Sequence, residues 1–342
     1  MQRQSVKVTV LVAVYNAGQY LRQCLDSLCR QTLTDIQIVC IDDCSTDGSP
    51  AILDDYATRD SRITVLRTPV NSGQAAARHL GLLQARGEYT AFLDSDDWLA
   101  PDSLATLMAA LTTGDDIDCA LFRLVNYNDD DGTYDDYLRP GLTAQPFKPG
   151  ETLTGEEAFR LSLDWTIHGV LAVRTYIYKE CPPAERRSLY DDENITRRQL
   201  LAARRVVITA APYFYRRHSR SSTQGFSPRR LDIMEAMLDL RQLVERQGFT
   251  DLLRPVERQL WLAVVDCYML YRDNRRRLTA DERRDARQRF ATMLQAVKTR
   301  RLPWRLRMKP GYIPVRHLPL FCLMEEAYFG LRGVFYVMKR GN

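Results

Sequence analysis

The most distinctive residues of the chain are four in a row, Asp94-Ser95-Asp96-Asp97, directly after the apolar run Tyr89–Leu93. Carboxylates at i and i+2 beyond a buried strand can point toward one ligand. Mg²⁺ and Mn²⁺ take one or two carboxylates and complete their shell with water and substrate phosphates. An acidic turn before a helix that begins at Pro101 is the simpler interpretation. The position at a predicted strand end favours the metal, because ligands bind outside the carboxyl ends of parallel strands.

Two other polar segments follow predicted strands. Asp42-Asp43-Cys44-Ser45-Thr46-Asp47-Gly48 comes directly after the apolar run Ile36–Ile41, and an acid there can accept hydrogen bonds from a nucleobase N–H or from ribose hydroxyls. Asn71-Ser72-Gly73 precedes a helical segment with Arg78. A glycine near a helix N-terminus lets a ligand approach the backbone, and an arginine can pair with phosphate. Turns and helix caps explain both segments as well, so neither identifies a ligand alone.

The elements that must hold these residues alternate between strands and helices. Apolar, largely β-branched runs predict buried strands at Val6–Val14, Ile36–Ile41, Ile63–Leu66 and Tyr89–Leu93. Apolar residues at helical spacing, and starting signals such as Ser49-Pro50, predict helices between them. This alternation predicts an α/β fold, a mostly parallel sheet with helices on both faces. All three polar segments then lie at its carboxyl edge.

The rest of the chain changes character twice. Residues 126–155 are acidic and rich in glycine and proline, which predicts an excursion over one edge of the sheet. From about Ser227 apolar residues recur at helical spacing. We therefore predict a domain at 1–226, made of two parts at 6–115 and 116–226, and a helical C-terminal region at 227–342.

The composition is that of a globular protein. The 342 residues are 45% hydrophobic and 27% charged, which excludes collagen-like and disordered classes. None of the eight cysteines forms a C-x-x-C pair, so a zinc site is not expected. We find no signal-peptide pattern and no apolar run long enough to span a membrane. These features predict reduced thiols and a cytoplasmic location.

The basic excess lies in the tail. The net charge is +5, and residues 301–342 carry eight Lys or Arg against Glu325 and Glu326. Large apolar residues such as Trp304 and Phe321 lie between the basic ones, and we expect a short amphipathic helix from about Pro319 to Lys339. Such a helix suits an anionic membrane surface, so the protein is expected to be peripheral on the inner membrane face. The alternative is that this helix packs on the catalytic domain and its arginines face water.

Four motifs in order resemble those of the family 2 glycosyltransferases, which have the GT-A fold, a Rossmann-like architecture. Val8–Asn16 resembles the family's opening strand with its Tyr-Asn end, and Phe92–Asp97 its F-L-D-S-D-D. Ile41–Gly48 has Cys44 where the family has glycine, and Asn71–Gly81 has His79 where it has asparagine. The resemblance covers residues 6–115 closely and 156–226 loosely. It implies sugar transfer with inversion from a nucleotide-diphosphate donor, a UDP-sugar, in polysaccharide or glycan synthesis.

The resemblance also implies roles for individual residues. Tyr15 would stack on the base, Asp43 would hydrogen-bond it, and Asp94 would face the ribose and sugar. Asp96 would ligate Mn²⁺ or Mg²⁺ on the diphosphate, which lets the metal neutralise the leaving group. The implied donor-binding set is Ala13, Tyr15, Asp43, Gly73, Arg78, Asp94 and Ser95. The acceptor would be a glycan or a lipid-linked molecule, and no nucleic acid is expected to bind.

An inverting transfer needs a base to take the proton of the acceptor hydroxyl. The family places an acidic pair well after its D-x-D, and Leu189-Tyr190-Asp191-Asp192-Glu193-Asn194 fills that place here. We assign the base to Asp192, with Asp191 as second choice. The simpler interpretation is an acidic helix N-terminus.

Four more residues complete the candidate site. Tyr213–Thr223 resembles the segment that often closes the catalytic domain, and its Arg216 and His218 are candidates for diphosphate contacts. Trp165 and His168 lie where acceptor-side residues occur; Trp165 can stack on a sugar ring. Stacked surface arginines, a core tryptophan and a structural histidine are the simpler interpretations.

Three competing classes remain. A haloacid-dehalogenase-type phosphatase needs Thr or Val where Trp98 stands, and a sugar-phosphate nucleotidyltransferase needs a Gly- and Arg-rich loop where Tyr15-Asn16-Ala17-Gly18 stands. A non-enzymatic nucleotide- or nucleic-acid-binding protein would use the basic tail and show strong salt dependence. The acidic strand ends argue against it, because they repel phosphates unless a metal intervenes.

Overall fold

The computed structural model describes residues 6–138, 141–181, 189–218 and 227–340; the side chains of residues 191–193 and 331–340 lie outside the described part. The chain forms two compact units, Met1–Gln224 and Gly225–Asn342. Each is described by itself.

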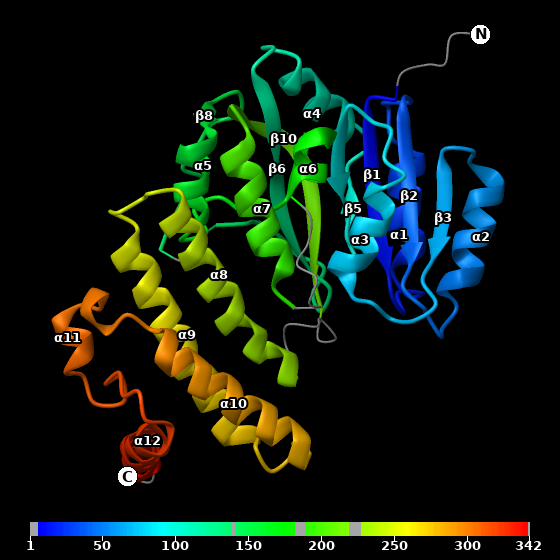
Figure 1. Ribbon diagram of the computed structural model, residues 1–342. Coiled ribbons are helices and arrows are strands. Elements are labelled where there is room, and N and C mark those ends of the chain that lie inside the picture. Colours follow the sequence, from blue (N-terminus) through cyan, green and yellow to red (C-terminus); the bar gives the residue numbers. More distant parts are fainter. Residues whose placement is uncertain (1–5, 139–140, 182–188, 219–226, 341–342) are drawn as a thin grey trace. The chain divides into compact units, whose positions relative to one another are not determined.

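The first unit is built on one sheet (Figure 1), whose strand order is β3-β2-β1-β4-β9-β6-β10-β5. The first half holds β1 (Val8–Val14), β2 (Ile36–Asp42), β3 (Ile63–Arg67) and β4 (Tyr89–Phe92), all parallel. The second half holds β5 (Trp98–Leu99), β6 (Ile117–Asn128), β9 (Leu171–Arg174) and β10 (Arg205–Arg217). β9 runs antiparallel between β4 and β6, while β6 and β10 are parallel.

Helices cover both faces of this sheet, as the sequence predicts. On one face α1 (Leu21–Cys29), α2 (Ser49–Arg59) and α4 (Ser103–Leu111) share a buried core with the strands, which includes Val10, Val12 and Phe122. On the other face lies α3 (Gln74–Leu82), where an added Cβ at Gly81 would come within 2.6 Å of Ile41. Glycine therefore lets α3 approach the sheet this closely without a shift of the Ile41 side chain. The remaining helices are α5 (Gly155–Ser162), α6 (Thr175–Glu180) and α7 (Asp191–Ala202).

The segment expected to be an excursion, residues 126–155, is more regular than predicted. β6 continues to Asn128, β7 (Tyr134–Asp136) pairs with β6, and β8 (Thr152–Thr154) pairs with β10. β7 and β8 have three residues each, too few for a pattern of alternating polarity to show in the sequence.

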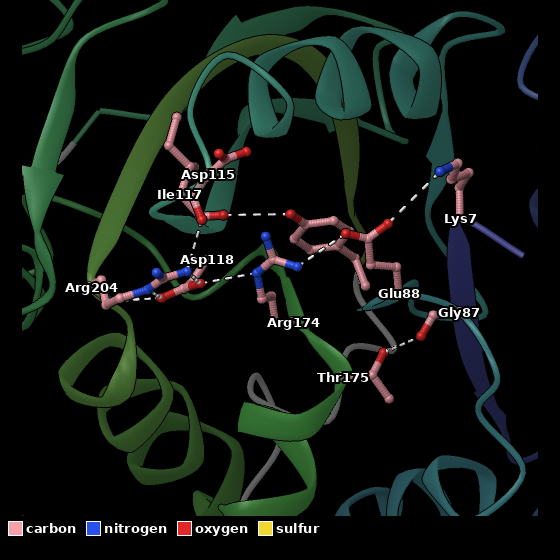
Figure 2. Close-up of polar contacts among 10 residues, drawn as sticks. Lys7, Gly87, Glu88, Asp115, Ile117, Asp118, Arg174, Thr175 and Arg204 are labelled. Atoms are coloured by element: carbon pink, nitrogen blue, oxygen red, sulfur yellow. Dashed lines mark hydrogen bonds and ion pairs between the residues drawn. The ribbon is translucent and has the colours of Figure 1, made fainter. Parts of the chain in front are cut away.

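A charge network around the buried Asp118 lies at the edge of the sheet where β6 and β10 begin and the antiparallel β9 ends (Figure 2). Asp118, which is fully buried, accepts hydrogen bonds from Arg174 Nε at 3.0 Å and from Arg204 Nη2 at 2.7 Å. The backbone N–H of Arg204 also donates to Asp118 at 2.9 Å. Although burial raises it, the pKa of Asp118 is lowered overall by these bonds from Arg204 and Arg174. The network fixes the connection between α7 and β10.

The second unit is helical, with α8 (Ile233–Arg246), α9 (Leu253–Asn274), α10 (Ala280–Ala296), α11 (Trp304–Arg307) and α12 (Leu318–Arg340). The tail helix expected from Pro319 is α12. Its Phe321 is fully buried and packs edge-to-face on Trp261 and Tyr268 of α9. No helix in the described ranges combines the length and apolar character needed to cross a bilayer.

Candidate active site

The loops after β1 and β2 are tied to each other at the carboxyl edge. Asn16 Oδ1 accepts a hydrogen bond from the backbone N–H of Thr46 at 2.8 Å, and Asn16 N donates to Ser45 Oγ at 3.0 Å. Asn16 and Cys44 have φ of 51° and 62°, the left-handed region where glycine has the least steric cost. Tyr15, directly before Asn16, is 50% exposed. Its ring is therefore available to a ligand, and Ala13 lies two residues before it on β1.

Asp43 is buried and holds the turn that begins α3. Its Oδ1 accepts hydrogen bonds from Ser72 N at 2.7 Å and Thr68 Oγ1 at 2.8 Å, and its Oδ2 accepts one from Gly73 N at 2.6 Å. Gly73 has φ of 91° and ψ of 158°, a conformation that only glycine adopts without strain. A carboxylate has about four lone-pair sites. Three of the four sites of Asp43 therefore accept hydrogen bonds from the protein itself.

Asp94 follows β4 and pairs with α3. Its Oδ1 accepts from Arg78 Nη2 at 2.5 Å and from Gln74 Nε2 at 2.8 Å. The Arg78 guanidinium lies 3.9 Å from the centre of the Phe92 ring, and its side chain is only 5% exposed. The strand end and the helix are thus joined by a nearly buried charge pair. Ser95, next in the chain, is half-buried.

Asp96 and His218 come together across 122 positions of sequence. His218 Nε2 lies 3.0 Å from Asp96 Oδ2, and the centre of its ring lies 4.9 Å from that of Tyr20, with the two rings tilted by 36°. The Asp96 side chain is 36% exposed and that of His218 is 10% exposed. The buried Nδ1 of His218 has no hydrogen-bond partner among the described residues. Of the acids in this segment, Asp96 is the one with an oxygen beside an imidazole nitrogen.

The chemistry of this pair fits a divalent cation. Mn²⁺ accepts a carboxylate oxygen and an imidazole nitrogen, whereas Mg²⁺ takes oxygen ligands and would use the carboxylate alone. Both ions need few protein ligands when a diphosphate supplies the others. Within the described ranges no group of three or more His, Cys, Asp or Glu side chains is placed to hold a metal. Asp96 and His218 therefore suit a metal that arrives with a phosphate ligand.

Asp97 is the structural acid of the segment. It is 1% exposed, and its oxygens accept from Tyr213 Oη and from the backbone N–H of Arg216, each at 2.8 Å. Burial, followed by the neighbouring carboxylates of Asp94 and Asp96, raises the pKa of Asp97 well above its usual value. Asp97 thus anchors β10 beneath the exposed Asp96.

The guanidinium of Arg216 donates to the chain itself. Its Nε donates to the carbonyl of Asp96 at 2.9 Å, Nη1 to Asp129 and Nη2 to Gln23, both at 2.5 Å. Its side chain is 6% exposed. The rings of Tyr20, Trp98 and Tyr127 lie around the guanidinium carbon at 4.7 to 5.2 Å. Arg216 therefore fixes the backbone at Asp96.

The candidate base residues Asp191 and Asp192 begin α7, and their side chains lie outside the described residues. Trp165 lies beside the same helix, with Arg197 of α7 5.3 Å from its ring centre. Trp165 is 38% exposed and has φ of 63°, which is rare for a bulky residue and is found mostly at functional sites. Its ring is held at the surface beside Arg197, in the middle of α7.

His168 has the contacts of a structural residue. Its Nδ1 accepts from Val170 N at 3.1 Å, and Tyr137 packs edge-to-face against the ring at 5.8 Å. Desolvation lowers the pKa of His168 from 6.5 to about 4. The imidazole is therefore neutral at physiological pH, with one nitrogen already used by the backbone.

Sequence reasoning missed the residues that support the site from a distance. Tyr213, Gln74, Gln23, Asp129 and Tyr20 all contact a predicted site residue. Tyr213 and Gln74 stand inside segments that the sequence singled out, so their motif positions were a usable signal. For Gln23 and Asp129 no signal exists, because only the fold brings them to Arg216.

Comparison with known proteins agrees with this geometry. Residues 9–165 match the model of "Glycosyl transferase family 2". The chain is 29% identical over 273 residues to glycosyltransferase GlyG of Streptococcus pneumoniae, covering 74% of this chain and 88% of that one. It is 40% identical over 140 residues to the putative glycosyltransferase EpsH of Bacillus subtilis, covering 41% of this chain and 40% of EpsH. The chain thus spans most of GlyG but less than half of EpsH.

Solved structures share the fold. S. aureus TarS 1-349 in complex with UDP-GlcNAc is 23% identical, with a TM-score of 0.66 over 95% of this chain and 92% of that one. Mannosyltransferase PcManGT from Pyrobaculum calidifontis, in complex with GDP-Man and Mn²⁺, is 16% identical, with a TM-score of 0.53 over 94% and 86%. These likenesses confirm the predicted GT-A fold, and the curated relatives favour an enzyme over the non-enzymatic alternative. With the four motifs in order along this fold, residues 9–165 of the chain are similar to glycosyltransferase family 2.

Proposed function

We propose that the protein transfers a sugar from a UDP-sugar to an acceptor hydroxyl with inversion, in the synthesis of a cell-surface polysaccharide or glycan. The observation that carries the proposal is the meeting of Asp43, the Arg78–Asp94 pair and the Asp96–His218 pair at one edge of the sheet. Relatives with such roles support it, among them the poly(ribitol-phosphate) beta-glucosyltransferase of Bacillus spizizenii.

The nucleotide end of the donor would lie against β1 and β2. Tyr15 presents an exposed ring for the base. Among the described residues, Asp43 Oδ2 accepts one hydrogen bond, from Gly73 N, whereas Oδ1 accepts two. The remaining lone pair on Oδ2 can accept the N–H of a pyrimidine base. Asp43 therefore orders the backbone and still has one acceptor site for the donor.

The diphosphate end would lie at Asp96 and His218, which would hold Mn²⁺ or Mg²⁺; the metal, when bound, neutralises charge on the departing diphosphate. The neighbouring residues keep that site in place. Arg216 donates to the carbonyl of Asp96 and through its backbone to Asp97. We therefore assign Arg216 a positioning part, with its guanidinium directed at the protein and not at phosphate.

The acceptor side would lie along α7. Asp192, with Asp191 as second choice, would take the proton of the acceptor hydroxyl as its oxygen attacks the anomeric carbon. Trp165, exposed beside the same helix over Arg197, would stack on the acceptor. His168, whose Nδ1 accepts a hydrogen bond from Val170 N, would support the loop that holds Trp165.

The test is transfer or hydrolysis of radiolabelled UDP-sugars with Mn²⁺ and with EDTA. Asp96→Ala should remove most Mn²⁺-dependent turnover and leave the fold intact, because the Asp96 side chain is 36% exposed. Asp102→Ala is the matched control, since Asp102 is exposed and makes no side-chain cap bond to α4. Near-wild-type, EDTA-sensitive turnover in Asp96→Ala would show that the metal is held elsewhere.

We also propose that the tail binds an anionic membrane surface, peripheral on the inner face. Trp304, Met308, Leu320 and Leu323 are 46 to 71% exposed, and Arg305, Arg307 and Lys309 lie among them in the sequence. Basic and exposed apolar residues together suit an interfacial surface, where each charge contributes about 1 kcal/mol. Lipid-linked acceptors would be reached there.

Sedimentation with anionic liposomes tests the tail. Trp304→Ser with Leu323→Ser should abolish low-salt co-sedimentation while the buried Phe321 keeps α12 packed on α9. Thermal unfolding of the double variant is the control, and it should match that of the wild type if the two substitutions leave the fold intact. Wild-type protein that stays in the supernatant at low salt would refute membrane binding.

A further inference from the structure

Four aromatic rings from four strands form a cluster, here called the aromatic patch, that the proposed catalytic roles leave unused. Trp98 of β5 is the cross-strand partner of Phe214 of β10, and Tyr127 of β6 is that of Tyr134 of β7. The Trp98 and Phe214 rings are stacked with centres 5.2 Å apart, and the two tyrosine rings have centres 5.0 Å apart. Contacts of 5.2 Å between Trp98 and Tyr127 and of 5.8 Å between Tyr134 and Phe214 join the two pairs.

The aromatic patch is open to solvent at Tyr134. This residue is 58% exposed, and Trp98, Tyr127 and Phe214 are half-buried. Single exposed rings are ordinary on protein surfaces, whereas contiguous ones mark an interaction site. Tyrosine and tryptophan combine a large rigid apolar surface with a polar tip, which suits a ligand that is apolar on one side and hydrated on the other. The patch therefore has the character of a binding surface.

The aromatic patch adjoins the candidate active site on the side away from the nucleotide. Trp98 follows Asp97 directly in the chain. The guanidinium of Arg216, which donates to the carbonyl of Asp96, lies 4.7 Å from the ring centre of Trp98. In the sheet, β1 and β2 lie on one side of β4, while β6 and β10 lie on the other. A donor with its base at β1 and β2 and its diphosphate at Asp96 therefore leaves β6 and β10 to the acceptor.

The charges beside the aromatic patch narrow the class of ligand. The turn between β6 and β7 carries the exposed acids Asp130 and Asp131. Arg123 and Arg217 are each paired with an acid of β7. Exposed carboxylates repel phosphate groups, so this surface disfavours a nucleic acid or a polyol-phosphate chain. An uncharged pyranose ring, with an apolar C–H face and hydroxyls at its rim, matches both the rings and the charges.

We propose that the aromatic patch binds a neutral saccharide unit of the acceptor, with a pyranose ring against the exposed ring of Tyr134. The inference rests on the proposed function, and it makes the acceptor an uncharged glycan. The patch holds the acceptor and takes no part in the proton transfer, which stays with the acids at the start of α7.

The experiment measures dissociation constants by calorimetry for the full chain with UDP and Mn²⁺. The ligands are neutral hexasaccharides of glucose, galactose and N-acetylglucosamine, together with poly(ribitol phosphate) and single-stranded RNA. Wild-type protein should bind at least one hexasaccharide and neither phosphate polymer. Tyr134→Ala should weaken that binding roughly two- to tenfold, which is the value of one aromatic contact. Tyr134→Leu keeps apolar bulk without the ring and should weaken binding by a similar factor.

Tyr176→Ala is the matched control, because Tyr176 is 51% exposed on α6 and lies outside the aromatic patch. It should bind the hexasaccharide as the wild type does, and thermal unfolding should show that all three variants are folded. Unweakened binding in Tyr134→Ala, no binding of any hexasaccharide, or tighter binding of a phosphate polymer would overturn the inference.

Hydrolysis of UDP-sugars by the wild type, measured beside these titrations, separates the two proposals. With hydrolysis present, the proposed function stands even where the titrations overturn the inference. Absence of hydrolysis with every UDP-sugar would instead refute the proposed function, and with it the acceptor role of the aromatic patch.

Discussion

Replacing Asp43 by asparagine changes one atom in the most heavily used carboxylate of the site. The new amide nitrogen can stand at either oxygen position. At the Oδ2 position the amide N–H groups would face two other donors, the N–H of Gly73 and the N–H of the base. At the Oδ1 position they would face one backbone donor, the N–H of Ser72. The second orientation is better, because Thr68 Oγ1 can accept from the amide while it donates to the Val70 carbonyl, 2.8 Å away.

The magnitude follows from these contacts. In the better orientation one backbone N–H, that of Ser72, loses its acceptor, which costs about 1–3 kcal/mol. Asp43→Ala removes all three hydrogen bonds and should lower the free energy of unfolding by about 3–5 kcal/mol. For UDP, the bond from the base changes from a charged to a neutral acceptor. That costs about 1 kcal/mol, or roughly five- to tenfold in Kd.

The assay is urea unfolding of the full chain followed by tryptophan fluorescence, with UDP affinity from calorimetry. Asp54→Asn is the matched control: Asp54 is exposed and pairs with Arg67 at 2.6 Å on the surface, where a pair contributes about 0–1 kcal/mol. Asp43→Asn that unfolds within 0.5 kcal/mol of wild type (about the limit of such a measurement) and binds UDP equally well would refute the reasoning.

Two further predictions concern the acceptor side. Asp192→Asn should lower turnover by about 10²–10⁴-fold with unchanged UDP affinity in calorimetry, because the amide cannot take a proton; a larger loss in Asp191→Asn would exchange their roles. Desolvation lowers the pKa of His168 from 6.5 to about 4 in the folded protein. Between pH 6.5 and pH 4 the histidine is therefore protonated in the unfolded chain but neutral in the folded one. Lowering the pH through this range stabilises the unfolded chain and so destabilises the fold. Between about pH 7 and pH 4 the free energy of unfolding of His168→Gln should therefore fall by up to about 3 kcal/mol less than that of the wild type. Plots of unfolding free energy against pH that run parallel for the two proteins would contradict this prediction.

Sequence could predict the half of the fold whose strands are long and buried. β1 and β2 have seven residues each and are apolar almost throughout, so their pattern is visible in the chain. β9 and β5 have four and two residues, too short for any period. Their places in the sheet depend on pairing with β4, β6 and β10. Sequence therefore predicted a mostly parallel sheet and missed the antiparallel strand within it.

The candidate site, like the fold, could be predicted only in part from the sequence. Asp94, Asp96 and Asp97 are adjacent and equal in chemistry, so the sequence could locate the acidic segment but not distinguish its members. Their surroundings distinguish them: Asp94 pairs with Arg78, Asp96 meets His218, and Asp97 is buried under Tyr213. Tyr213 and His218 stand more than 110 positions away, a contact that only the folded sheet creates.

The Asp118 network has a consequence for how such an enzyme can change in evolution. Its charges hold β6, β9 and β10 together at the amino edge (Figure 2), while the proposed chemistry takes place in loops at the opposite edge. Removing one member of a buried ion pair costs about 3–5 kcal/mol, so Asp118 and Arg174 are poor places for variation. The loops at the carboxyl edge contribute little to the Asp118 network. New donor or acceptor preferences can therefore arise there with little loss of stability through exposed residues such as Tyr15, whereas buried residues such as Asp43 are costly to replace.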